Sequence, residues 1–226
     1  AVDPAALIKT VFEGHADSPV GLLGPAVPWA ADLRAWKKET YPGSTGAAAT
    51  GKVPGATAAG SVPAGTAITL ASYTDRPELG EMVPLLAQQL EAAGFTVTQD
   101  VREYNQIESE ALAGAFDAVL LSRSTVLDSG DPVAYMVSDF SSTGSFALSF
   151  LSDPTVDATI AKASGIEPGE ERRKAIMEAE QAILVTDAAI PVAHERVLQG
   201  EASGVSGAER DPNERDLITS ATTVKK

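Results

Sequence analysis

One stretch of the sequence gathers side chains that suit ligand binding. Residues 115–132, AFDAVLLSRSTVLDSGDP, begin with an apolar run, Phe116–Leu121, that breaks into a polar loop. The run is too short for a helix and is typical of a buried strand in a parallel or mixed sheet. Asp131 and Pro132 suit a helix start, because aspartate accepts hydrogen bonds from free N–H groups and proline fits the first helical position. The stretch therefore predicts a strand, a loop and a helix.

The loop of this stretch holds the candidate ligand contacts. In open α/β sheets, ligands bind beyond the carboxyl ends of the strands, so Asp128 lies where such a contact is expected. Arg123 has a planar cation that suits a ligand carboxylate. Both residues also have plainer explanations: Asp128 as a turn residue bonded to its own backbone, and Arg123 as a solvated cation. The residue types alone leave these alternatives open.

The elements before this stretch form a β-α-β pattern that would position the loop. The sequence predicts a strand at Ala67–Tyr73, a helix at Pro77–Ala93 and a second strand at Phe95–Val101, joined in the right-handed sense. Pro84 falls inside the helix and either kinks it or marks its start. A second helix, Asn105–Ala113, then leads into the apolar run.

The rest of the chain is predicted to be helices, short strands and one low-complexity segment. Residues 42–66 are rich in Gly, Ala, Thr and Pro and are expected to form a loop or linker. Within them GAAATGK matches the first part of a phosphate-binding loop, but the preceding strand and following Ser or Thr are missing, so no nucleotide site is expected. The further predictions are helices at 3–12, 29–38, 132–137 and 170–185, a helix that begins at Asp153-Pro154, strands at 146–150 and 190–199, and a polar tail at 204–226.

Two of these predictions concern particular side chains. The helix at 170–185 should bury a stripe that contains Ile176, Ala179 and Ile183, with Arg172–Lys174 on the outside. Trp36 is expected in the core, whereas Trp29, flanked by proline, is either a core residue or a lining of the ligand site.

Composition excludes several classes of protein. The 226 residues have a net charge of −14 and a pI near 4.5, so the cations that neutralise phosphates in a nucleic-acid-binding protein are lacking. With no cysteine, disulfides and thiol-based sites are excluded. No apolar run reaches the roughly 18–20 residues of a membrane helix, and no signal segment opens the chain.

The candidate catalytic and metal-binding constellations are weak. Asp128 and Asp131 could form a carboxylate pair for glycoside hydrolysis, but a helix cap explains Asp131 fully. His15 and His194 are the only histidines, and Glu195, beside the second, faces the opposite side of a strand. No serine lies in a G-x-S-x-G elbow. We therefore predict no enzyme, no metal site and no cofactor, with His194 a partly buried strand residue.

Seven stretches, across roughly nine-tenths of the chain, carry a family resemblance by their order: AVDPAALIKTVFEGHA, AGFTV, GAFDAVLLS, DSGDPVAY, SDPTVDATIAKA, ERRKAIMEAEQAILVTDAAIPV and GVSGAERDP. Taken together they resemble the family 5 extracellular solute-binding proteins, the oligopeptide-, dipeptide- and nickel-binding receptors of bacterial ABC importers. The resemblance implies the C-terminal lobe of a two-lobed receptor, a periplasmic-binding-protein-like α/β fold with a mixed, mostly parallel sheet flanked by helices. It implies an N-terminal helix and irregular segment at 1–66, an α/β core at 67–203, and a tail at 204–226 that returns toward an N-terminal lobe absent from this chain.

The resemblance also implies a role for the loop. In peptide-binding members, an aspartate at the position of Asp128 pairs with the α-ammonium group of the peptide, which needs a carboxylate partner when it leaves water. The expected ligand-binding residues are those of the loop together with one tryptophan: Asp128, Arg123, Ser124, Thr125, Ser129 and Trp29. Relatives often have a tryptophan where this chain has the Ser122–Thr125 segment, so an aromatic shelf is missing and the ligand class stays open.

The function implied by the resemblance is solute capture for import. The protein would bind oligopeptides or dipeptides between two lobes, close over them by a hinge movement and deliver them to an ABC permease in the membrane. It would be extracytoplasmic, either periplasmic or a cell-surface lipoprotein in its full-length form, and would bind no nucleic acid. Two alternatives remain: a nickel-chelate or other small-solute receptor of the same family, and a stand-alone α/β interaction or hydrolase domain.

Overall fold

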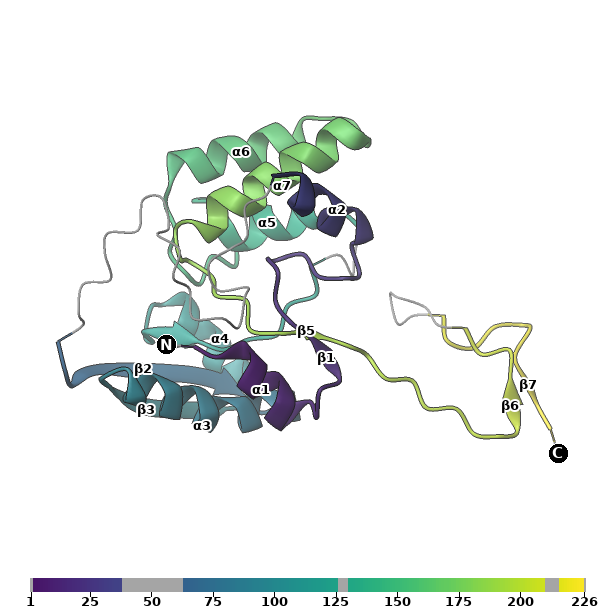
Figure 1. The fold of residues 1–226 in the computed structure, drawn as a ribbon, viewed down its shortest axis with the longest axis horizontal. Coiled ribbons are helices and arrows are strands. Elements are labelled where there is room, and N and C mark those ends of the chain that lie inside the picture. The colour runs from purple at the N-terminus through teal and green to yellow at the C-terminus, as the bar shows by residue number, and fades with distance from the viewer. Residues whose placement is uncertain (1, 38–62, 126–129, 210–215, 226) are drawn as a thin grey trace.

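The computed structural model describes residues 2–37, 63–125, 130–209 and 216–225, the side chains of 35–37 excepted. Two groups of elements, each with its own hydrophobic core, make up most of this part of the chain (Figure 1). One group is an α/β unit around a parallel sheet, and the other is a cluster of helices. The α/β fold class that was predicted is confirmed.

The sheet of the α/β unit has three parallel strands. β2 (Thr66–Tyr73) lies in the centre, between β3 (Phe95–Arg102) and β4 (Ala118–Val119). β2 and β3 pair along their whole length, from Thr66 opposite Phe95 to Tyr73 opposite Arg102. The predicted β-α-β unit is therefore confirmed.

Three helices accompany the sheet. α3 (Pro77–Ala92) packs against β2 and β3, α1 (Pro4–Val11) packs against α3, and α4 (Tyr104–Leu112) packs against β2. Pro84 lies inside α3 on its exposed side, so the alternative that it marks the helix start is wrong. The buried residues of this unit are mainly large apolar side chains: Leu7, Leu70, Tyr73, Leu79, Met82, Val83, Leu86 and Leu120.

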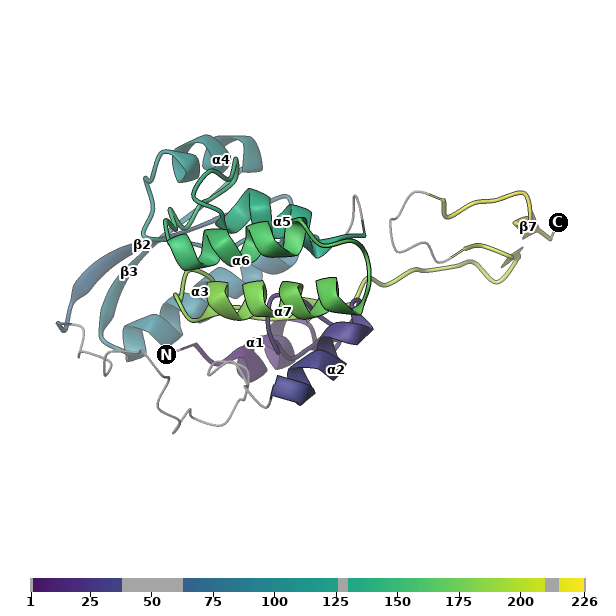
Figure 2. The same ribbon diagram turned by 90° about the horizontal axis from the view of Figure 1, so that it is seen from above.

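The second group consists of α2 (Pro28–Lys37), α5 (Pro132–Phe140), α6 (Pro154–Ser164) and α7 (Glu170–Leu184). Figure 2 shows α6 and α7 side by side, and the two helices share the largest helix–helix interface. The predicted apolar stripe of α7 is confirmed, because its members are at most 3% exposed: Ile176, Ala179 and Ile183.

Aspartates begin three of these helices, as the sequence predicts. Asp3 accepts from Ala6 N, Asp131 from Val133 N, and Asp153 from Thr155 N and Val156 N, each with proline directly after the cap. Such caps satisfy N–H groups that have no partner inside the helix and stabilise it by about 1 kcal/mol.

Three predicted strands are shorter than expected or absent. The apolar run 116–121 contributes only Ala118–Val119, and 190–199 contributes only β5 (His194–Glu195), which pairs antiparallel with β1 (Ala16–Asp17). The predicted strand at 146–150 is wrong: this segment forms successive turns, with Phe150 in the left-handed region at φ 52°. A strand needs a neighbouring backbone, and no described strand lies beside these residues to supply its hydrogen bonds.

Two further regions bear on the predictions. Arg172 does not lie outside α7 as expected, since its side chain is only 15% exposed. Beyond β5, residues 196–209 and 216–225 belong to an arm with a small hairpin of β6 (Val205–Ser206) and β7 (Thr223–Val224), set apart from the two groups in both views (Figures 1 and 2). The division of the chain at 66 and 203 remains a prediction, and the GAAATGK segment, most of 42–66 and the Trp36 side chain lie outside the described residues.

Candidate functional site

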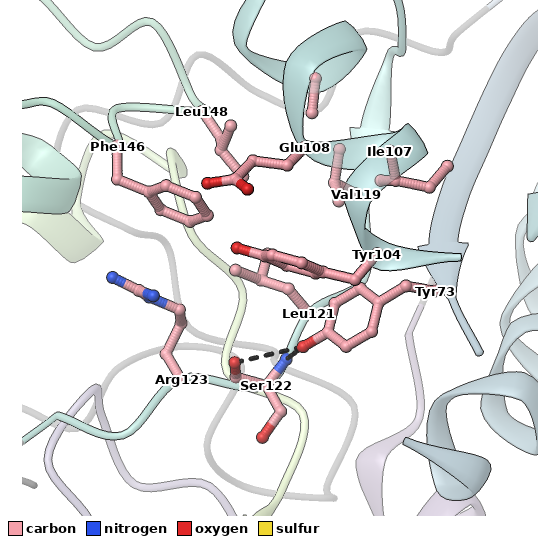
Figure 3. A pocket seen from close by; sticks show the side chains of 11 residues that line it. Tyr73, Tyr104, Ile107, Glu108, Val119, Leu121, Ser122, Arg123, Phe146 and Leu148 are labelled. Carbon is pink, nitrogen blue, oxygen red and sulfur yellow. Dashed lines mark hydrogen bonds between the residues drawn. The ribbon is translucent and has the colours of Figure 1, made fainter. Parts of the chain in front are cut away.

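A pocket of about 320 Å³, its mouth included, opens at the carboxyl edge of the sheet. Tyr73 is the last residue of β2, and Leu121–Arg123 follow β4 closely, so the pocket lies where parallel sheets commonly bind ligands. Figure 3 shows the side chains that line it. They come from the ends of the strands, from α4 and from the turns after α5: Tyr73, Tyr104, Ile107, Glu108, Ala111, Val119, Leu121, Ser122, Arg123, Phe146 and Leu148.

Arg123 is held in this pocket by α5. Its Nε donates to Asp139 Oδ2 and its Nη2 to Asp139 Oδ1, each at 2.7 Å. The Asp139 side chain is 7% exposed, whereas that of Arg123 is 35% exposed. The guanidinium carbon also lies 4.3 Å from the ring centroid of Phe146, a stacking distance for a cation on an aromatic face. Burial opposes its charge, but the bonds to Asp139 outweigh burial and raise the pKa of Arg123.

Aromatic rings form the opposite wall. Tyr73 and Tyr104 meet edge to face, with centroids 5.0 Å apart. The hydroxyl of Tyr73 accepts from the backbone N–H of Ser122 at 3.0 Å, which fixes the first residues after β4 against the end of β2 (Figure 3). This wall therefore joins the ends of β2 and β4 to the start of α4.

Glu108 adds a carboxylate to this pocket. It lies one helical turn after Tyr104 on α4, and residues four apart share a helix face. Burial and then the neighbouring Glu108 carboxylate raise the pKa of the Tyr104 hydroxyl, which stays protonated at neutral pH. Among the described residues Glu108 forms no ion pair.

Of the predicted ligand-binding residues that the structure describes, only Arg123 lies in the pocket lining. Arg123 lines the pocket, whereas Ser124 is exposed and Thr125 half-buried, both outside its lining. Asp128 and Ser129 lie outside the described residues, so their predicted roles remain predictions.

Trp29 lies in the other group of elements. It packs against the core of the helical cluster, and the guanidinium of Arg173 lies 5.6 Å from its ring centroid. Of the two roles that the sequence left open, the structure gives Trp29 the packing role and does not place it in the pocket lining.

An ion pair joins Asp131, the N-cap residue of α5, to Arg172 of α7. Arg172 Nη2 donates to Asp131 Oδ2 at 2.5 Å, and Nη1 donates to the carbonyls of Ala163 and Ile166 at the end of α6. Asp131 thus has a structural role as a helix cap and ion-pair partner, which accounts for it without glycoside chemistry.

His194 is a half-buried residue of β5, as the sequence predicts, and His15 is exposed. Burial lowers the pKa of His194, and its Nε2 is buried without a hydrogen-bond partner among the described residues. No group of three or more potential ligands to a metal gathers anywhere in the described part of the chain.

Sequence reasoning missed most of this pocket. Tyr73 and Tyr104 could have been found, because one ends a predicted strand and the other begins the helix after the next strand. Glu108 follows from Tyr104 by helical spacing. Phe146 gave no usable signal, because its segment was predicted to be a strand and its position depends on turns after α5.

None of the helices in the described segments is both long and apolar enough to span a membrane.

Comparison with known families identifies the chain. Residues 1–147 match the model of the bacterial extracellular solute-binding proteins, family 5 middle region, and the chain belongs to this family. A search among curated proteins finds no match.

Solved structures show the same fold. A dipeptide-binding protein from Pseudoalteromonas sp. SM9913 in complex with Met-Leu is 18% identical, with a TM-score of 0.73 over 99% of this chain and 43% of its own. NikA from Staphylococcus aureus in complex with Ni(L-His)2 is 16% identical, with a TM-score of 0.69 over 99% of this chain and 46% of its own. AppA from Bacillus subtilis in complex with a nonapeptide is 13% identical, with a TM-score of 0.69 over 100% and 46%. The chain spans less than half the length of these proteins.

Proposed function

We propose that this chain is the C-terminal lobe of the solute-binding component of an ABC importer, which captures oligopeptides or dipeptides and delivers them to the membrane permease. The observation that carries the proposal is the family match over residues 1–147, which contain nearly all of the pocket lining. Similar structures in complex with Met-Leu and with a nonapeptide support a peptide as the ligand.

The protein would act by closing two lobes over the ligand. A ligand that contacts both lobes binds the closed state better and shifts the population toward it. In this scheme Asp128 pairs with the α-ammonium group of the peptide, and Ser124, Thr125 and Ser129 supply hydrogen bonds around it. Arg123, held by Asp139, supplies a cation for a ligand carboxylate. The full-length protein would work outside the cytoplasm, as a periplasmic protein or a lipoprotein.

Native mass spectrometry of the full-length protein, purified without refolding, tests the proposal. A ladder of co-purifying peptide masses is expected, and Asp128→Ala should remove it. The matched control is Asp32→Ala, at an exposed position of α2, which should leave the ladder unchanged.

Other outcomes would change the proposal. A single mass with a nickel isotope pattern would move the function to metal-chelate uptake, as in NikA from Staphylococcus aureus, whose structure contains Ni(L-His)2. The isolated 226-residue chain should bind peptide only weakly, because half of the site belongs to the other lobe. Submillimolar binding by this chain that is insensitive to Asp128→Ala would contradict the proposed site.

A further inference from the structure

The charges around the pocket do not balance. Asp139 neutralises Arg123 through two hydrogen bonds of 2.7 Å, and both side chains are at least partly buried. Glu108 has no such partner among the described residues. The lining therefore has one uncompensated negative charge, in a protein whose net charge of −14 attracts cations over longer distances.

The walls of the pocket suit a cation as well. Tyr73, Tyr104 and Phe146 present aromatic rings, whose faces attract cations. Arg123 already uses the Phe146 face at 4.3 Å. In Figure 3, the Glu108 carboxylate lies above the Tyr104 ring, and both this carboxylate and the Tyr104 hydroxyl point toward Phe146. A cation there would meet a carboxylate and an aromatic ring together.

The dimensions limit the ligand group to a side chain. The volume of about 320 Å³ includes open solvent at the mouth, so the enclosed part of the pocket is smaller than a typical small-molecule site. The apolar part of the lining, which includes Ile107, Leu121 and Leu148, suits the methylene stem of a long side chain, while the charged head remains near Glu108.

From this arrangement we propose that the pocket admits a lysine or arginine side chain of the ligand, and that Glu108 is the residue that selects it. The inference rests on the proposed function, because it takes the ligand to be a peptide, but every residue that it invokes belongs to the described part of the chain. Arg123, paired with Asp139, forms a wall of this pocket, and only its exposed part is left for the ligand carboxylate of the proposed function.

The test compares three tripeptides on the 226-residue chain: Ala-Lys-Ala, Ala-norleucine-Ala and Ala-Glu-Ala. Titration followed by ¹H–¹⁵N NMR measures weak affinities and reports folding of every variant in the same spectra. Ala-Lys-Ala should bind about tenfold more tightly than Ala-norleucine-Ala, a difference of about 1.4 kcal/mol, and Ala-Glu-Ala should bind most weakly. Added salt should reduce the preference for lysine.

Glu108→Gln should abolish the preference by weakening Ala-Lys-Ala about tenfold while leaving Ala-norleucine-Ala unchanged. Glu110→Gln is the matched control, because Glu110 lies on the same helix outside the pocket and pairs with Arg102. Equal binding of the three peptides, or a lysine preference that survives Glu108→Gln, would overturn the inference and leave the proposed function standing. Absence of binding by all three peptides, also in the full-length protein, would overturn both.

Discussion

Two arginine–carboxylate pairs of this protein have similar geometry and different roles. Arg34 on α2 binds Glu180 on α7, with Nη2–Oε1 at 2.6 Å and Nε–Oε2 at 3.0 Å, and Arg123 binds Asp139 in the same two-pronged way at 2.7 Å. Both carboxylates are almost completely buried, with side chains 3% and 7% exposed. The difference between the pairs lies in what else surrounds them.

The Arg34–Glu180 pair is enclosed by the protein's own backbone. Glu180 Oε1 also accepts from Leu23 N at 2.8 Å, and Arg34 Nη2 also donates to Leu23 O at 2.6 Å. The loop approaches so closely that a Cβ on Gly21 would lie 2.6 Å from Glu180 Oε1. Arg34 is 15% exposed, so this pair fastens the loop before α2 to α7 and has no face open to a ligand.

The Arg123–Asp139 pair is fastened on one side only. Its other side faces an aromatic ring and the pocket, and 35% of the Arg123 side chain is exposed. Two ion pairs of similar geometry can therefore differ in role. The backbone that encloses the Arg34–Glu180 pair makes it structural, whereas the open pocket beside Arg123 leaves that pair accessible to a ligand.

Among substitutions that test the difference between the two pairs, Glu180→Gln should have the largest effect on stability. The substitution leaves the Arg34 charge buried without an anion, which should reduce the free energy of unfolding by about 3–5 kcal/mol. Urea denaturation followed by circular dichroism measures the change. Glu178→Gln on the same helix removes an exposed pair with Lys162 and should cost no more than about 1 kcal/mol. Equal losses in the two variants would contradict the structural role of the enclosed pair.

Asp139→Asn should have a smaller effect on stability. Hydrogen bonds to charged groups contribute about 1.5–3 kcal/mol, and water can reach part of Arg123, so a loss of about 1–2 kcal/mol is expected from the same denaturation experiment. The substitution should also change ligand affinity, because Arg123 loses its anchor, whereas Glu180→Gln in protein that remains folded should not. An affinity change in the Glu180 variant alone would reverse our assignment of the two pairs.

The loop that the enclosed pair fastens provides a steric test. In Gly24→Ala, the new Cβ would lie 2.6 Å from Cγ and from Nδ1 of His194, so β5 must shift, at a cost of about 1–3 kcal/mol. Gly80→Ala in α3 meets nothing within 4 Å and should stabilise the helix by up to about 1 kcal/mol. Thermal unfolding should therefore shift the two midpoints in opposite directions, and a shift in the same direction would argue against the tight approach of the loop.

The smallest expected effect is a pH dependence of the free energy of unfolding that arises from the titration of His194. Arg34, of the enclosed pair, and Asp17, on β1, act on its charge in opposite directions, and burial is the largest influence. Because the folded pKa lies below the usual value of 6.5, the unfolded chain binds more protons as the pH falls below it. The stability that neutral His194 preserves is present in full above about pH 6.5 and is lost on acidification. The free energy of unfolding should then fall by at most about 1.4 kcal/mol per pH unit.

Denaturation of His194→Gln at several pH values checks this expectation. The variant should show a flatter dependence of unfolding free energy between about pH 5 and 7 than the parent chain. His15→Gln, at an exposed position, serves as the control and should leave the slope unchanged. A slope that is identical in the parent and in His194→Gln would exclude this histidine as the source.

Local signals in the sequence determined most of the helices. Asp-Pro pairs begin α1, α5 and α6 because cap and proline act on the first turn alone, independently of the rest of the fold. The 3.6-residue period likewise predicted the buried stripe of α7, since its members lie on one face of the helix. The β-α-β unit and the family resemblance were also readable from the sequence, and the family match confirms the latter.

Only the tertiary structure decided the partners of the charged residues and the extent of the strands. Arg172 was expected on the surface but reaches the end of α6 and Asp131, and the strand expected at 190–199 is reduced to two residues that find a partner in β1. The pocket joins Glu108 of α4 to Arg123 beyond β4 and Phe146 of a turn. Caps and helical stripes depend on neighbours within four residues, whereas burial, strand pairing and ion pairs depend on residues that the chain brings together from far apart.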